Sequence, residues 1–288
     1  MDNKLKSILA VLAHPDDESF GIGGTLAYYA QQGVQVHLVC ATRGEVGDVD
    51  SEYLEGFASI AERREHELQC AAENLGLASV HFLDYRDSGM PGSPDNNHPK
   101  ALFAAPQEEV AQKIVHFMRL LQPQVVLTFD PIGGYKHPDH ITIHNATVQA
   151  FDLAGKPDYQ DPLPPYQPQK LYYSVIPKNF LRIGLYVLRI LGKDPRHFGR
   201  NHDVDLAALV DEGDFPIHAK INYSSVLKQR DEAAACHASQ GGGMVRGPLA
   251  VIRRLAGSYE YFMQAYPPPE PSKTDKDLFA GVQLPEPA

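Results

Sequence analysis

Short apolar runs alternate with segments of helical character along the first half of the chain. Four of the runs are expected to form strands: SILAVLA (7–13), VQVHLVCAT (34–42), SVHFLDY (79–85) and QVVLTFD (124–130). The segments between them are expected to form helices: 21–33, 59–76 and 108–123. SILAVLA is apolar without interruption, as expected of a strand that is covered on both faces. The alternation predicts βαβ units and therefore an α/β fold with a parallel sheet.

The pattern is looser after residue 151. The elements expected there are a strand at 170–176, an apolar helix at 179–193, a strand at 215–223 and a helix at 224–239. We expect a single domain over residues 1–265, with an insertion at about 155–205 that begins with a proline-rich connector. The tail at 266–288 is rich in Pro, Glu, Asp and Lys, and is expected to be loose.

Composition excludes several classes of function. Lys and Arg number 26 against 36 Asp and Glu, which gives a formal net charge of −10, and no basic run predicts nucleic-acid binding. No apolar run reaches the roughly 18 residues of a membrane span, and a cytoplasmic protein is expected. The cysteines, Cys40, Cys70 and Cys236, are odd in number and scattered without a CxxC pair, which fits a reducing compartment and argues against a disulfide framework.

Ionisable side chains follow two of the expected strands. The stretch AHPDDE (13–18) comes directly after the first strand, and DPIGGYKHPDH (130–140) comes after the fourth. Ligands of parallel sheets bind beyond the carboxyl ends of the strands, where both stretches lie. His14, Asp17 and His140 would form a set of two histidines and one carboxylate, which leaves coordination positions open, as in catalytic sites. Zinc is the expected ion, and iron(II) accepts the same donors.

The neighbours of these ligands suggest hydrolytic chemistry. The side chains of Asp16 and Asp17 diverge in an extended segment, so Asp16 can face water at the metal and act as a general base. His137 and His140 are three residues apart and share a face if a helix begins there. His137, protonated, would then stabilise an oxyanion and donate a proton to the leaving amine.

AHPDDE together with HPDH resembles the LmbE-like (PIG-L) family of zinc-dependent N-deacetylases, over about residues 5–150, with a looser echo at 228–240. The resemblance implies a Rossmann-like, mostly parallel sheet flanked by helices, and removal of an acetyl group from N-acetylated amino sugars. It implies the same three metal ligands and the same base. It also implies further roles: His137 as electrostatic catalyst and acid, Asp139 as the residue that orients a histidine, Tyr135 near the oxyanion, and Arg64, Asp87, His237 and Gln240 in substrate binding.

Other interpretations of single residues remain open at this stage. Arg64 and Asp87 could form an ordinary surface ion pair. Glu45 could support the site from behind, and Glu18 could cap a helix or hold the loop.

Alternative functions also remain open. The chain could be an amidase that acts on a larger thiol-sugar conjugate, or a binding protein that holds a metal without catalysis. The glycines of GIGG lack the spacing G-x-G-x-x-G, which disfavours a nucleotide enzyme. The expected partner is a small amino-sugar substrate, and a homo-oligomer is allowed.

Overall fold

The computed structural model describes residues 6–190, 192, 194–196, 205–211, 214–242, 257–271 and 273–284. Its sheet has the strand order β3-β2-β1-β4-β5-β7-β6. The strands are β1 (Ser7–Leu12), β2 (Gln35–Cys40), β3 (Ser79–Phe82), β4 (Val125–Phe129), β5 (Lys170–Val175), β6 (Ala219–Asn222) and β7 (Tyr259–Tyr266). The first five strands in the chain pair in parallel, which confirms the predicted α/β fold with a mostly parallel sheet.

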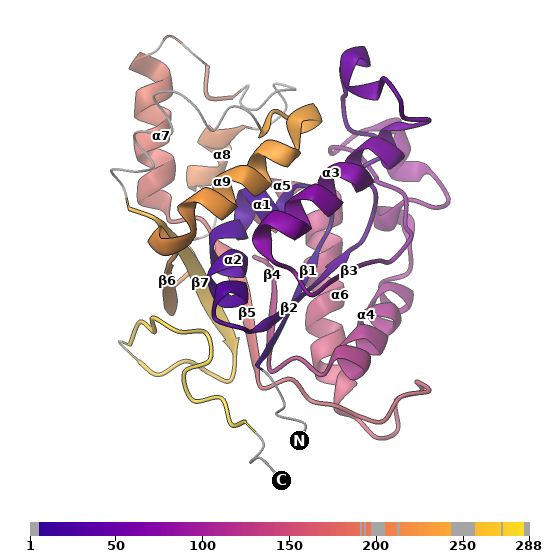
Figure 1. Cartoon of the computed structure of the whole chain (residues 1–288), viewed down its shortest axis with the longest axis vertical. Helices are drawn as coiled ribbons and strands as arrows, with labels where there is room; N and C mark the ends of the chain where they lie inside the picture. The colour runs from indigo at the N-terminus through magenta and orange to yellow at the C-terminus, as the bar shows by residue number, and fades with distance from the viewer. Residues whose placement is uncertain are drawn as a thin grey trace.

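Helices cover both faces of the sheet. They are α1 (Asp17–Gly21), α2 (Gly23–Gln31), α3 (Ile60–Leu75), α4 (Gln107–Leu121), α5 (Gly133–Lys136), α6 (Pro138–Ala154), α7 (Lys178–Ile190), α8 (Leu206–Asp211) and α9 (Leu227–Cys236). Figure 1 shows α3 and α9 side by side on one side of the sheet, with α4 and α6 packed together on the other. Each face has its own buried apolar cluster, as a central parallel sheet requires.

Local sequence explains where the long helices begin and end. Ser59 accepts a hydrogen bond from the backbone N–H of Glu62 at the start of α3, and Gly76 ends that helix with a φ of 74°. Gln122 ends α4 in the same left-handed region, directly before Pro123. The helix expected at 224–239 begins only at Leu227, because Ser224 lies in a short 3-10 turn that precedes α9.

The order of the strands places the two ionisable stretches together. β1 pairs with β2 on one side and with β4 on the other, so the chain changes direction across the sheet between β1 and β4. Ligands of open α/β sheets bind at such a switch point, beyond the carboxyl ends of the strands. AHPDDE leaves β1 and DPIGGYKHPDH leaves β4 at this point.

The sequence did not predict β7. This strand lies between β5 and β6 and is antiparallel to both. The tail also differs from its prediction, since Leu278 and Phe279 are buried in the core beside α2. The Tyr29 hydroxyl donates a hydrogen bond to Asp277 at 2.8 Å and accepts one from the backbone N–H of Leu278. This part of the tail is therefore packed, not loose. Part of the insertion expected at about 155–205 lies outside the described residues.

The structure contains one disulfide that the sequence did not predict. Cys70 on α3 and Cys236 at the end of α9 are joined by a disulfide, while Cys40 is free and buried. The two bonded cysteines are 166 residues apart, so their pairing depends on the packing of α3 against α9, which no local spacing reveals. No helix within the described part of the chain is long and apolar enough to cross a membrane.

Replacing Cys70 by serine is expected to lower the free energy of unfolding by about 2–4 kcal/mol, because the bond restricts a long loop of the unfolded chain. The midpoint of thermal unfolding should fall by about 4–8 °C, measured by circular dichroism. Reductant should lower the midpoint of the unmodified protein to the same value and leave that of Cys70→Ser unchanged. Equal midpoints without reductant would contradict the prediction.

Candidate active site

The carboxyl end of β1 supplies a histidine and an aspartate that face each other. His14 follows the strand, and its backbone N–H donates a hydrogen bond to Asp17 Oδ2 at 2.8 Å. The Nδ1 atom of His14 lies 3.7 Å from the same oxygen. Both side chains are nearly inaccessible to solvent. Burial opposes ionisation of Asp17, but the charges and hydrogen bonds of His140 and His14 outweigh it and lower the pKa of this carboxyl.

The third expected ligand comes from the first turn of α6. His140 is packed flat on Phe129, the last residue of β4, with ring centroids 3.9 Å apart. Its Nδ1 lies 3.2 Å from the carbonyl oxygen of Gly133, which can only accept, so Nδ1 carries the hydrogen and Nε2 presents its lone pair. A Cβ at Gly133 would lie 2.8 Å from the Cβ of His140, so this close approach requires glycine.

Donor atoms of these three residues converge on one point. His140 Nε2 lies 3.2 Å from both His14 Nδ1 and Asp17 Oδ1. Ligand atoms at the corners of a tetrahedron around zinc lie about 3.3 Å apart, given metal–ligand distances of about 2.0–2.1 Å. Two imidazole lone pairs and a carboxylate at this spacing therefore fit a divalent cation. His137 also brings a ring nitrogen within 4.8 Å of those of His14 and His140.

Carboxylates behind His14 fix its orientation. Asp139 is fully buried, and its Oδ2 lies 3.1 Å from His14 Nε2 and accepts a hydrogen bond from the backbone N–H of Ser88. Asp87 Oδ1 lies 3.5 Å from the same histidine nitrogen. A carboxylate on one imidazole nitrogen turns the other nitrogen toward the metal and makes it more basic. Glu45 supports this arrangement by accepting the backbone N–H of Asp87 at 3.0 Å.

Asp16 lies beside the ligand cluster in a strained conformation. Its φ is 134°, a region that non-glycine residues rarely adopt, and its Oδ2 lies 2.9 Å from Arg64 Nη2. The same guanidinium donates to the carbonyl oxygens of Pro15 and Gly44. Burial raises the pKa of Asp16 to about 6, although the charge of Arg64 acts in the opposite direction. A carboxylate with this pKa can accept a proton close to neutral pH.

His137 precedes α6 and caps it. Its Nδ1 accepts a hydrogen bond from the backbone N–H of Asp139 at 3.2 Å, so in the neutral ring Nε2 carries the hydrogen. Burial lowers the pKa of His137, and the neighbouring His14 and His140 lower it further. These contacts favour a neutral His137, in contrast to the protonated ring expected from the sequence.

A polar cavity of about 440 Å³ opens over these groups. Its wall includes the following predicted residues: His14, Asp16, Arg64, Asp87, Tyr135, His137 and Gln240. Tyr135 comes from α5, and its ring centroid lies 4.9 Å from that of His140. Arg64 and Asp87 are buried and contact Asp16 and His14 respectively, so the alternative of a surface ion pair between them is wrong.

His237 does not take the place predicted for it. Its side chain is fully buried and lines neither of the cavities found in the described part of the chain. Its Nε2 lies 2.7 Å from Glu18 Oε1, and Glu18 Oε2 accepts the backbone N–H of Asp16 at 3.0 Å. Glu18, paired with His237, therefore stabilises the strained backbone of Asp16 through this hydrogen bond. This contact agrees with the alternative that Glu18 holds the loop, whereas its partner His237, 219 residues away, could not be predicted from the sequence.

Comparisons with known proteins identify relatives of this chain. The family model "PIG-L: GlcNAc-PI de-N-acetylase" matches residues 9–151. A protein of Acidothermus cellulolyticus named 1D-myo-inositol 2-acetamido-2-deoxy-alpha-D-glucopyranoside deacetylase is 37% identical, over 97% of this chain and 96% of that protein. A protein of Catenulispora acidiphila named as deacetylase 2 for the same compound is 35% identical, over 96% of this chain and 97% of its own.

Solved structures share the fold at lower identity. The conserved protein TT1542 from Thermus thermophilus aligns with a TM-score of 0.59 at 23% identity, over 90% of this chain and 94% of its own. GalB, the 4-carboxy-2-hydroxymuconate hydratase from Pseudomonas putida, has the same TM-score at 21% identity, over 91% of this chain and 97% of its own. A hydratase within this set shows that the fold alone does not fix the reaction. The sequence relatives, which extend over nearly the whole chain, do fix the family: the chain belongs to the PIG-L (GlcNAc-PI de-N-acetylase) family.

Proposed function

We propose that the chain is a metal-dependent amide hydrolase that removes the acetyl group from an N-acetylated amino sugar or its conjugate. The convergence of His14, Asp17 and His140 next to Asp16 carries the proposal. The first candidate substrate is the inositol conjugate of N-acetylglucosamine, because the relatives of highest similarity reported above are named as deacetylases of that compound.

The donor set fits zinc, and iron(II) accepts the same ligands. The cation would supply Lewis acidity, which polarises the amide carbonyl and lowers the pKa of water at the site. Asp16 lies beside the ligands and takes the proton that water loses as its oxygen attacks the carbonyl carbon. Arg64 keeps the carboxylate of Asp16 in place through their 2.9 Å contact.

His137 and Tyr135 border the polar cavity on the side of α5 and α6. In the tautomer that its cap imposes, His137 donates a hydrogen bond from Nε2 to the developing oxyanion. The proton held by Asp16 then passes to the amine as the C–N bond breaks. Asp87 keeps Oδ1 near His14, and its Oδ2 accepts the backbone N–H of Val46 at 3.3 Å. Asp87 and Gln240 both line the polar cavity, where they can reach sugar hydroxyls.

A panel of N-acetylated sugars tests the proposal. The protein is reconstituted with zinc or iron(II), and free amine is quantified with N-acetylglucosamine, its inositol and malate conjugates, and chitobiose. We expect amine release, fastest with the inositol conjugate, and none from the chelated protein. If the fully metal-loaded protein releases no amine from any of these sugars, the removal of acetyl groups is overturned, and the alternative of an amidase that acts on a larger conjugate is favoured. A cytoplasmic location and a homo-oligomeric state stay predictions, which fractionation and light scattering can check.

A further inference from the structure

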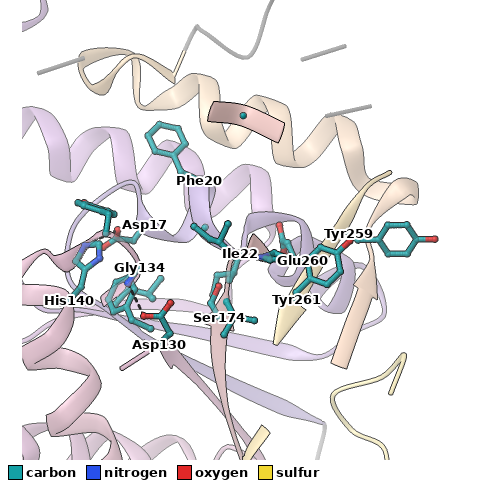
Figure 2. Close-up of a pocket in the computed structure, with 18 of the residues that line it drawn as sticks. Asp17, Phe20, Ile22, Asp130, Gly134, His140, Ser174, Tyr259, Glu260 and Tyr261 are labelled. Carbon is teal, nitrogen blue, oxygen red and sulfur yellow. Dashed lines mark hydrogen bonds and ion pairs between the residues drawn. The ribbon is translucent and has the colours of Figure 1, made fainter. Parts of the chain in front are cut away.

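A second, larger cavity begins at the same catalytic cluster. It has a volume of about 600 Å³ and is lined at one end by Asp16, Asp17 and His140. Figure 2 shows Asp17 and His140 at this end, Phe20 and Ile22 along the way, and Tyr259 and Tyr261 at the far end. The cavity therefore leads away from the reacting groups toward the beginning of β7.

Most of the wall of this cavity is apolar, in contrast to the polar cavity, although the charged residues Asp130, Arg230 and Glu260 also line it. Its sides are formed mainly by Leu12, Ile22, Phe129, Val175, Ile183 and Val187. The two cavities share Asp16 and Tyr135, so they meet at the catalytic cluster from different sides. An apolar space of this size is in the range of cavities that bind small organic ligands, and an acetyl methyl group would fill only a small part of it.

Apolar side chains that line this cavity also remain exposed to solvent. Ile176 and Ile183 both line the cavity, yet 53% and 52% of their respective surfaces remain exposed. Ile183 belongs to α7, within the segment that the sequence marked as an insertion. Large exposed apolar side chains beside a cavity are typical of ligand-binding surfaces.

The geometry of the amide assigns each cavity to one half of the substrate. In a secondary trans amide, the acyl chain and the group on nitrogen extend in opposite directions from the C–N bond. With the sugar among the charged and polar groups near Arg64 and Asp87, the acyl chain is directed toward the other cavity. We propose that the apolar cavity is an acyl-chain subsite, and that this enzyme hydrolyses amino sugars carrying N-acyl groups longer than acetyl.

This inference rests on the proposed amide hydrolysis and names its substrate class. The reaction is balanced by water alone. The oxygen of water bonds to the acyl carbon, the C–N bond breaks, and the nitrogen leaves as an amine with one of the protons of water. The other product is a carboxylic acid, which loses its proton at neutral pH.

The test measures kcat/KM for glucosamine N-acylated with acetyl, butyryl, hexanoyl or octanoyl groups. Burial of each added methylene should raise kcat/KM about fourfold until the chain fills the cavity. If kcat/KM stays constant or falls as the acyl chain becomes longer than acetyl, while acetyl itself is released, the acyl-chain subsite is overturned and the proposed function remains. No release from any member by the metal-loaded protein would overturn both.

Two further comparisons sharpen the test. A Cβ at Gly184 on α7 would meet no atom within 4 Å, so Gly184→Leu can fill the cavity without disturbing the helix. This variant should lower kcat/KM for the octanoyl substrate at least tenfold and leave that for the acetyl substrate within about twofold. Asn179→Leu, an exposed position on the same helix outside the cavity, should change neither.

The cavity could instead hold a group attached to a sugar oxygen. O-octyl N-acetylglucosaminide, which carries its alkyl chain there, tests this alternative. If its O-alkyl chain raises kcat/KM as much as an N-octanoyl chain does, and Gly184→Leu removes that gain, the cavity holds the group at the other end of the sugar. That result would overturn the acyl-chain assignment. A gain confined to the N-acyl series would support it.

Discussion

Asp16→Asn is expected to lower kcat about 10²–10⁴-fold without removing the metal, because the amide keeps the shape of the carboxylate but cannot accept the proton from water. The ligands His14, Asp17 and His140 are unchanged, so metal content should match that of the unmodified protein. KM should change little, since the substitution acts on proton transfer and not on the sugar. Steady-state kinetics on the acetylated substrate and elemental analysis of the metal check both parts.

Asp84→Asn is the matched control for this variant. Asp84 also pairs with an arginine, Arg43, at 2.6 Å, but 70% of its side chain is exposed and it lies outside both cavities. An exposed ion pair contributes little, so this variant should retain kcat within about twofold. A fully metallated Asp16→Asn protein with normal kcat would exclude Asp16 as the base and favour the alternative of a metal-holding binding protein.

Loss of the metal is expected to lower activity at least as much as Asp16→Asn does. His140→Ala removes a donor that lies 3.2 Å from both other ligands, and the remaining pair should not retain the cation at micromolar concentrations. Activity should fall by about 10³-fold or more, since the Lewis acid contributes several kcal/mol to the transition state. Chelation should reduce the unmodified protein to the same level.

Restoration by added metal separates a lost ligand from a damaged fold. Zinc should restore the chelated protein but not His140→Ala. His66→Ala, an exposed histidine on α3, should behave like the unmodified protein in both experiments. Full activity of His140→Ala, or of a protein shown to be free of metal, would contradict the metal-dependent mechanism.

The sequence predicted the central part of the fold because the information there is local. The four apolar runs became β1 to β4, and Ser59 and Gly76 marked the ends of α3. β7 was missed; its place between β5 and β6, antiparallel to both, is set by strand pairing that the local sequence does not show. The burial of Leu278 was missed because the short apolar run at 278–282 lies between polar, proline-rich segments, and its contact with α2 forms only in the folded chain.

The same difference between local information and long-range contacts explains which residues of the site could be predicted from the sequence. The ligand geometry could be predicted because both stretches follow directly from neighbouring strands, so the sheet itself brings His14 and His140 together. The partners that support them come from elsewhere. Glu18 and His237 are buried together through the packing of α1 and α9, and no local spacing in the sequence pairs them.

The bond between α3 and α9 also affects how the chain behaves when it is cut. The proline-rich connector at 155–169 is largely exposed and lies between the two bonded cysteines in sequence. Proteolysis at one peptide bond in this connector would leave an amino-terminal and a carboxyl-terminal piece, which carry β1–β4 and β5–β7 respectively. The two pieces would stay covalently linked, and would separate on a denaturing gel only after the sample is reduced.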